Sequence, residues 1–62
     1  MSGKDLAKQL ELNGWRLLRI QGSHHIYGKE GTIARISVPI HGNRALRKGL
    51  LRHLLKSANL SD

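Results

Sequence analysis

The sequence predicts an α+β domain in which a helix, three antiparallel strands and a second helix follow one another. Apolar residues recur at helical spacing near both ends of the chain, while the middle carries short strand-like stretches between turn signals. Each predicted helix has one apolar stripe that must be buried. We therefore expect both helices to pack on one face of the sheet. The other face should be open to solvent and carry Arg or Lys side chains from the strands.

The first helix is predicted over residues 3–12. Ser2 is a suitable N-cap, and Asp5 completes a variant of the capping box in which Asp replaces Glu. The leucines that follow fall on one helical face. Gly14 is a stop signal, because glycine readily adopts the left-handed conformation found after many helices.

The three strands are predicted over residues 15–21, 24–27 and 32–38. Alternation in the first strand is imperfect, so two registers remain open: Leu18 and Ile20 face the core with Arg16, or the reverse holds. In the third strand, residues 34, 36 and 38 line one face and residues 33, 35 and 37 line the other.

The last helix is predicted over about residues 48–58, where leucines form a broad apolar stripe. Pro39 ends the third strand because it has no N–H to donate to the ladder. Gly49 weakens the start of the helix, and Asn59 and Ser61 end it.

The composition indicates a single domain, residues 1–62, that binds a polyanion. Eleven Lys and Arg against four Asp and Glu give a net charge of +7, which favours nucleic acid first and an acidic protein second. With one Trp, one Tyr and no Phe, recognition by stacking on several aromatic rings is poorly supported. No apolar run approaches the roughly 18 residues of a membrane span, and no signal peptide is evident. We expect a soluble cytoplasmic protein that does not bind membranes.

Gly22-Ser23-His24-His25 is the stretch most suggestive of chemistry. Two small residues allow a tight turn, and histidine can both take and give a proton near neutral pH. Period-two alternation places His24 on one face of the second strand and His25 on the other. The simpler interpretation is a hairpin turn followed by surface histidines.

Four segments carry a resemblance to a known family: Asn13-Gly14-Trp15, Gly22-Ser23-His24-His25, Val38-Pro39-Ile40-His41, and the leucine-rich stretch from Leu46 through Leu60. In their order and spacing over nearly the whole chain, they resemble the HicA toxin family (YcfA-like messenger-RNA interferases). The resemblance implies a fold like that of double-stranded-RNA-binding domains, cleavage of messenger RNA without a metal, and inhibition by a HicB antitoxin. It also implies that the functional histidine is the first after Gly-Ser, here His24.

Ribonuclease chemistry needs few protein groups, because RNA carries its own nucleophile in the 2′-hydroxyl. His24 is the candidate acid or base, and nearby cations would stabilise the charge of the transition state. Ser23 either positions a phosphate or only shapes the turn, and His41 either approaches the phosphate or holds its loop. The residues predicted to contact RNA are Gly22, Ser23, Arg16, Arg19, Lys29 and Arg35.

Two alternatives bear on this interpretation. The four histidines suggest a metal site, but their spacing matches no helical ligand pair, there is no Cys, and Asp and Glu are scarce, so we predict no metal and no other cofactor. The second alternative is a module that binds double-stranded RNA without cleaving it.

Overall fold

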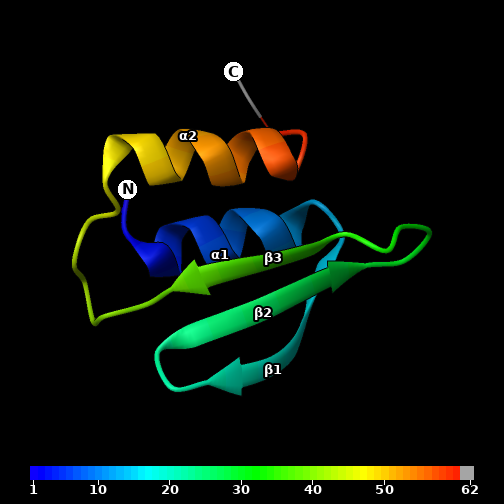
Figure 1. The fold of residues 1–62 in the computed structure, drawn as a ribbon, viewed down its shortest axis with the longest axis horizontal. Helices are drawn as coiled ribbons and strands as arrows, with labels where there is room; N and C mark the ends of the chain where they lie inside the picture. Colours follow the sequence, from blue (N-terminus) through cyan, green and yellow to red (C-terminus); the bar gives the residue numbers. More distant parts are fainter. Residues whose placement is uncertain (61–62) are drawn as a thin grey trace.

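The computed structural model describes residues 1–60, and its elements follow the predicted order (Figure 1). They are α1 (Gly3–Leu12), β1 (Trp15–Gln21), β2 (His24–Lys29), β3 (Arg35–Pro39) and α2 (Lys48–Ser57). The strands form one antiparallel sheet in the order β1-β2-β3. The predicted α+β class with its α-β-β-β-α order is therefore confirmed.

α1 begins and ends where its sequence signals predict. The Ser2 hydroxyl accepts the N–H of Asp5 at 3.2 Å, and the Asp5 carboxylate accepts the N–H of Ser2 at 3.1 Å, which completes the capping box. The hydrogen bond from the Ser2 backbone, aided by that of its side chain, holds the pKa of Asp5 below its usual value of 3.8. Gly14 follows the helix with a φ of 90°.

α2 starts without a side-chain cap and ends in a Schellman motif. Arg47 occupies the N-cap position, and no side-chain hydrogen bond is made there. Asn59 adopts a left-handed φ of 62°, and its N–H donates to the Lys56 carbonyl at 3.1 Å. The N–H of Leu60 donates to the Leu55 carbonyl at 2.7 Å, the second bond of this motif. Asn59 thus ends the helix as predicted, while Ser61 lies outside the described residues.

The hairpin between β2 and β3 differs from the prediction. The second strand continues past Tyr27 to Lys29, and the third begins at Arg35 rather than at residue 32. The Thr32 hydroxyl accepts the N–H of Ala34 at 3.0 Å, so a local side-chain bond takes the place of a ladder bond. Ala34 is consequently exposed and does not join the core face of the strand.

A β-bulge in β1 explains the imperfect alternation of that strand. Leu17 pairs with Tyr27 and Arg19 pairs with Ile26, so Leu18 is an extra residue without a partner of its own. Before the bulge, Trp15 faces the helices and is buried. After the bulge the alternation restarts one residue later, and neither of the two strict registers holds along the whole strand.

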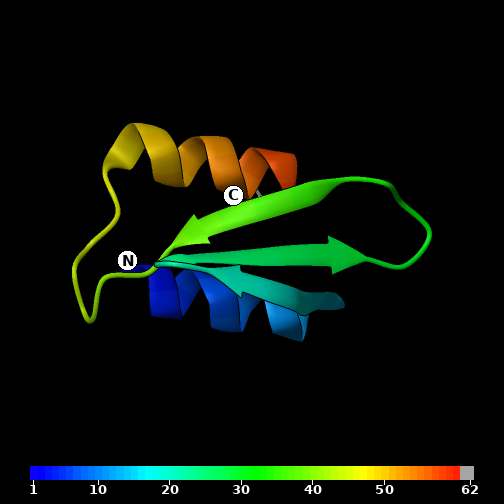
Figure 2. The ribbon, with the colours of Figure 1, turned by 60° about the horizontal axis from the view of Figure 1, so that its bottom comes forward.

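Both helices bury their apolar residues in one core with one face of the sheet. α1 packs under the sheet and α2 lies along β3 (Figure 2). Complete burial of each large apolar side chain stabilises the fold by about 1.5–3 kcal/mol. No helix of residues 1–60 lies on the opposite face, which we call the open face. The core consists of Leu6, Ala7, Leu10, Trp15, Tyr27, Ile36, Val38, Leu54 and Ala58.

Candidate nucleic-acid interface

A tight turn presents His24 at one end of the sheet. Gln21 and His24 pair as the last residues of β1 and the first of β2, so Gly22 and Ser23 form a two-residue hairpin loop. Gly22 has a φ of 60° and Ser23 a negative one, which is the pattern of a type II′ turn. Glycine at this position accepts the left-handed φ without strain, which fixes the register of the histidine that follows.

The His24 ring lies exposed on the open face, and Ser37 holds it. His24 Nδ1 is 3.1 Å from the Ser37 hydroxyl oxygen of the neighbouring strand. The register explains this contact, because His24 pairs with Pro39 and Ile26 pairs with Ser37, which makes His24 and Ser37 diagonal neighbours on one face. The contact uses Nδ1 and does not involve the other ring nitrogen, Nε2.

Ser37 was not among the site residues predicted from the sequence. Alternation placed it on the polar face of its strand, but its position opposite His24 depends on the β2–β3 register. The length of the β2–β3 hairpin sets that register, and the sequence did not reveal it.

The other two histidines near the turn occupy different positions. His25 pairs with Val38, whose side chain is in the core, so its half-buried side chain faces the helix side. His41 lies in the loop after β3, with Nε2 3.5 Å from the Ser23 hydroxyl. The N–H of Ile40 donates to the Ser23 carbonyl at 2.8 Å and fastens this loop to the turn. Two exposed imidazoles, His24 and His41, are thus attached to the same end of the sheet.

The predicted RNA-binding cations do not gather around His24. Arg19 is the nearest by register, since it pairs with Ile26, two residues from His24 along β2. Arg16 and Arg35 both pair with Gly28, four residues from His24, which corresponds to about 13 Å along a strand. Lys29 lies on the helix side, where its ammonium is 5.9 Å from the centre of the Trp15 ring.

Within residues 1–60, no group of three or more His, Cys, Asp or Glu side chains is arranged to hold a metal ion. In the same part of the chain, no helix is long and apolar enough to cross a membrane.

Fold and site together define a small basic α+β domain that displays a histidine on the open face of an antiparallel sheet. The family model for the HicA toxin of bacterial toxin–antitoxin systems matches residues 3–60, so the chain belongs to the HicA toxin family. A comparison with curated proteins gives no match. Membership of this family implies an antitoxin as a partner.

Proposed function

We propose that this toxin is a metal-independent endoribonuclease that cleaves messenger RNA with His24 as its catalytic residue. One observation carries the proposal: the imidazole is exposed on the open face, and Ser37 fixes it through Nδ1. The net charge of +7 supplies attraction for the polyanionic substrate. Messenger RNA as target also makes the cytoplasm the site of action.

The chemistry needs one proton acceptor and one proton donor. His24 Nε2 takes the proton of a ribose 2′-hydroxyl, and the resulting alkoxide attacks the adjacent phosphorus. The bond to the 5′-oxygen breaks, and that oxygen takes up a proton to leave as a hydroxyl. The products are a 2′,3′-cyclic phosphate and a new 5′-hydroxyl end. A positioned imidazole accelerates such proton transfers by about 10²–10⁴.

His41 is the candidate for the proton donor. It is the second imidazole at this end of the sheet, and the contact between its Nε2 and the Ser23 hydroxyl keeps it beside the turn. Arg19 is the cation closest in register to His24 and would stabilise the charge that develops on the phosphorane. Gly22 and Ser23 bring the backbone of the turn to the phosphate.

The antitoxin partner fits the same surface, and we propose that it is of the HicB type. An acidic protein face would bind the arginines of the open face and cover His24 at the same time. RNA and antitoxin would then compete for one site, and neutralisation would need no separate inhibitory mechanism.

Cleavage of RNA in the presence of EDTA tests the proposal. We expect His24→Ala to lower the rate by at least about 10². The control His53→Ala removes an exposed histidine of α2 and should cleave at the wild-type rate. If His41 is the proton donor, His41→Ala will lower the rate as well.

A non-catalytic module that binds double-stranded RNA is the competing function, favoured by the helix-sheet-helix order and the basic charge. RNA that stays intact during prolonged incubation, together with tight and salt-sensitive binding, would establish it. Cleavage by His24→Ala at the wild-type rate would instead remove His24 from the mechanism.

A further inference from the structure

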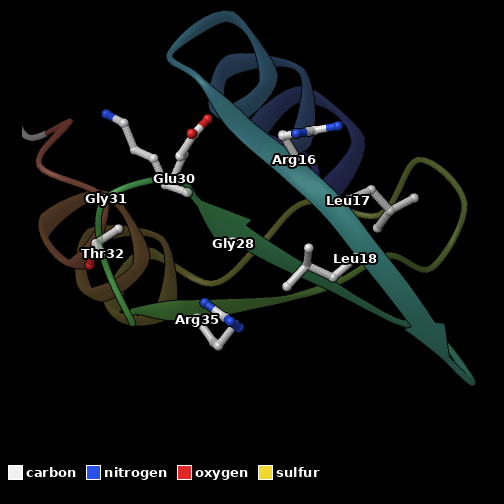
Figure 3. Close-up of a pocket in the computed structure, with 9 residues that line it drawn as sticks. Arg16, Leu17, Leu18, Gly28, Glu30, Gly31, Thr32 and Arg35 are labelled. Atoms are coloured by element: carbon white, nitrogen blue, oxygen red, sulfur yellow. The ribbon is translucent and has the colours of Figure 1, made fainter.

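A hollow of about 540 Å³ lies at the end of the open face away from His24 (Figure 3). Its floor is Gly28 in the middle strand. Arg16 and Arg35, the direct partners of Gly28 on either side, line the hollow together with Leu18. Neighbouring strands are about 4.8 Å apart, so the two arginines start from backbone positions about 10 Å apart, one on each side of Gly28.

The absence of a side chain at Gly28 makes room for Leu18 and Arg35, which cover the glycine and leave it buried. A Cβ atom there would lie 2.7 Å from Leu18 Cδ1 and 3.2 Å from Arg35 Nη1. Leu18 and Arg35 therefore lean over the glycine from opposite sides. Leu18 reaches this position because it is the extra residue of the β1 bulge, and 49% of its surface remains exposed.

The electrostatics of the hollow favour an anion. Arg35 Nη1 donates to the carbonyl oxygens of Ala34 at 2.9 Å and Ile33 at 3.4 Å. These bonds orient the guanidinium but leave its charge uncompensated, since carbonyl groups are neutral. Lys29 borders the hollow, but its ammonium lies on the helix side over the Trp15 ring, and among residues 1–60 Glu30 is the one carboxylate in the lining. The two guanidinium groups of the open face, from Arg16 and Arg35, outnumber the Glu30 carboxylate among the lining residues, and guanidinium groups suit a phosphate.

We propose that this hollow is a second RNA subsite, which binds a phosphate and the adjoining ribose of the substrate strand at a distance from the cut. The guanidinium groups of Arg16 and Arg35 hold the phosphate, and Leu18 supports the apolar side of the ribose or base. The inference rests on the proposed function, because it places the scissile phosphate at His24. The separation of about 13 Å along β2 means that a dinucleotide cut at His24 cannot reach the hollow, whereas a longer strand can.

The subsite predicts that the contribution of Arg16 and Arg35 depends on the length of the RNA. For an RNA of about eight nucleotides, the size range of short single-stranded sites, we expect Arg16→Ala and Arg35→Ala each to raise KM about tenfold without lowering kcat. The matched control is Arg52→Ala, which removes an exposed arginine of α2. For a dinucleotide substrate, Arg16→Ala and Arg35→Ala should raise KM no more than this control does.

Binding without turnover separates the subsite from the catalytic proposal. In a His24→Ala background, fluorescence anisotropy with a labelled RNA of the same length should show the tenfold loss for Arg16→Ala even if the wild type proves not to cleave RNA. If Arg35→Ala lowers the melting temperature because its hydrogen bonds to carbonyl groups are lost, the test of the subsite rests on Arg16→Ala alone. Equal losses for dinucleotide and longer RNA, or losses no greater than for Arg52→Ala, would overturn the subsite.

Discussion

At the scale of single residues, the site depends on a hydroxyl that fixes an imidazole. Ser37 engages His24 Nδ1, and both side chains project from neighbouring strands of a sheet whose other face is packed against the core. A ring held at one nitrogen samples fewer orientations, so the other nitrogen meets the substrate in a defined direction. Under the proposed mechanism, Ser37 acts through His24 and is a positioning residue.

Ser37→Ala should lower kcat about threefold to tenfold and leave KM unchanged, because one neutral hydrogen bond contributes roughly 1 kcal/mol. Steady-state cleavage of RNA measures both constants. Ser57→Ala is the matched control, since its hydroxyl donates to the His53 carbonyl on α2 and does not touch the sheet. A Ser37→Ala variant with wild-type kcat would show that the bond has no catalytic role.

Asp5 makes the stability of the fold depend on acid pH. Its pKa is lowered in the folded state, chiefly by the backbone hydrogen bond from Ser2. The carboxylate therefore stabilises the fold above its ordinary pKa of 3.8, and this contribution is lost as the pH falls through the lower folded value. Thermal unfolding at pH 7 and pH 3 should show a smaller loss on acidification for Asp5→Asn than for the wild type. Equal losses in the two proteins would contradict this role.

At the scale of elements, two glycines near helix starts have opposite roles. Gly3 opens α1 where the chain passes the end of β3. A Cβ atom there would collide with the Pro39 carbonyl oxygen and lie 2.9 Å from Ile40 Cγ1. Gly49 in α2 has no atom within 4 Å of the corresponding position. The first glycine permits close packing, while the second only weakens a helix.

The Gly→Ala pair tests this difference. Gly3→Ala should destabilise the domain by about 1–3 kcal/mol, because the carbonyl oxygen belongs to the backbone and cannot move aside easily. Gly49→Ala should stabilise it by up to about 1 kcal/mol through helix propensity. Chemical denaturation measures both, and a stable Gly3→Ala variant would show that the α1–β3 contact can relax.

The β1 bulge is the element that shapes the open face. In a regular strand, each residue of β1 would pair with one residue of β2. The bulge instead inserts the unpaired Leu18 between Leu17 and Arg19. As a result Leu18 reaches over Gly28 while Arg19 pairs with Ile26 closer to His24. The irregular pattern of this strand in the sequence therefore has a structural consequence at the candidate RNA surface.

At the scale of the whole molecule, charge and layering divide the protein into two sides. α1 covers one face of the sheet, and α2 lies along β3 and completes the core. The other face carries His24, Arg16, Arg19 and Arg35. Because the surface of so small a domain is limited, we expect RNA and antitoxin to bind the same face. Electrostatic attraction of either partner should weaken with salt.

The salt dependence of the RNA-binding constant indicates how many phosphates the protein neutralises. If Arg16, Arg19 and Arg35 each neutralise one phosphate, the slope of log K against log salt concentration should be about −2 for single-stranded RNA. Removing one of them should reduce the slope by about 0.7. Anisotropy titrations of the His24→Ala protein at several salt concentrations give the slope. A slope unchanged by Arg19→Ala would exclude that residue from the phosphate contacts.

Much of the fold followed from local signals. The capping box of Ser2 and Asp5, the stop at Gly14 and the left-handed Asn59 are short-range features, and each fixes a helix end within a few residues of itself. The Gly22-Ser23 turn is equally local and correctly separated β1 from β2. The hairpin that follows was misjudged, because the Thr32 hydroxyl competes with the ladder for a backbone N–H.

By itself, the sequence determined the order of helices and strands, the basic charge, the face on which His24 lies relative to His25, and the resemblance to the HicA toxins. Only the tertiary structure decided which residues meet across the sheet: Ser37 beside His24, His41 beside Ser23, and two arginines around Gly28. The physical reason is register. Alternation along one strand determines the face on which a side chain lies. Its neighbours on the adjacent strands depend on the hairpin lengths and on the bulge, and a register shift of one residue would replace all of these neighbours.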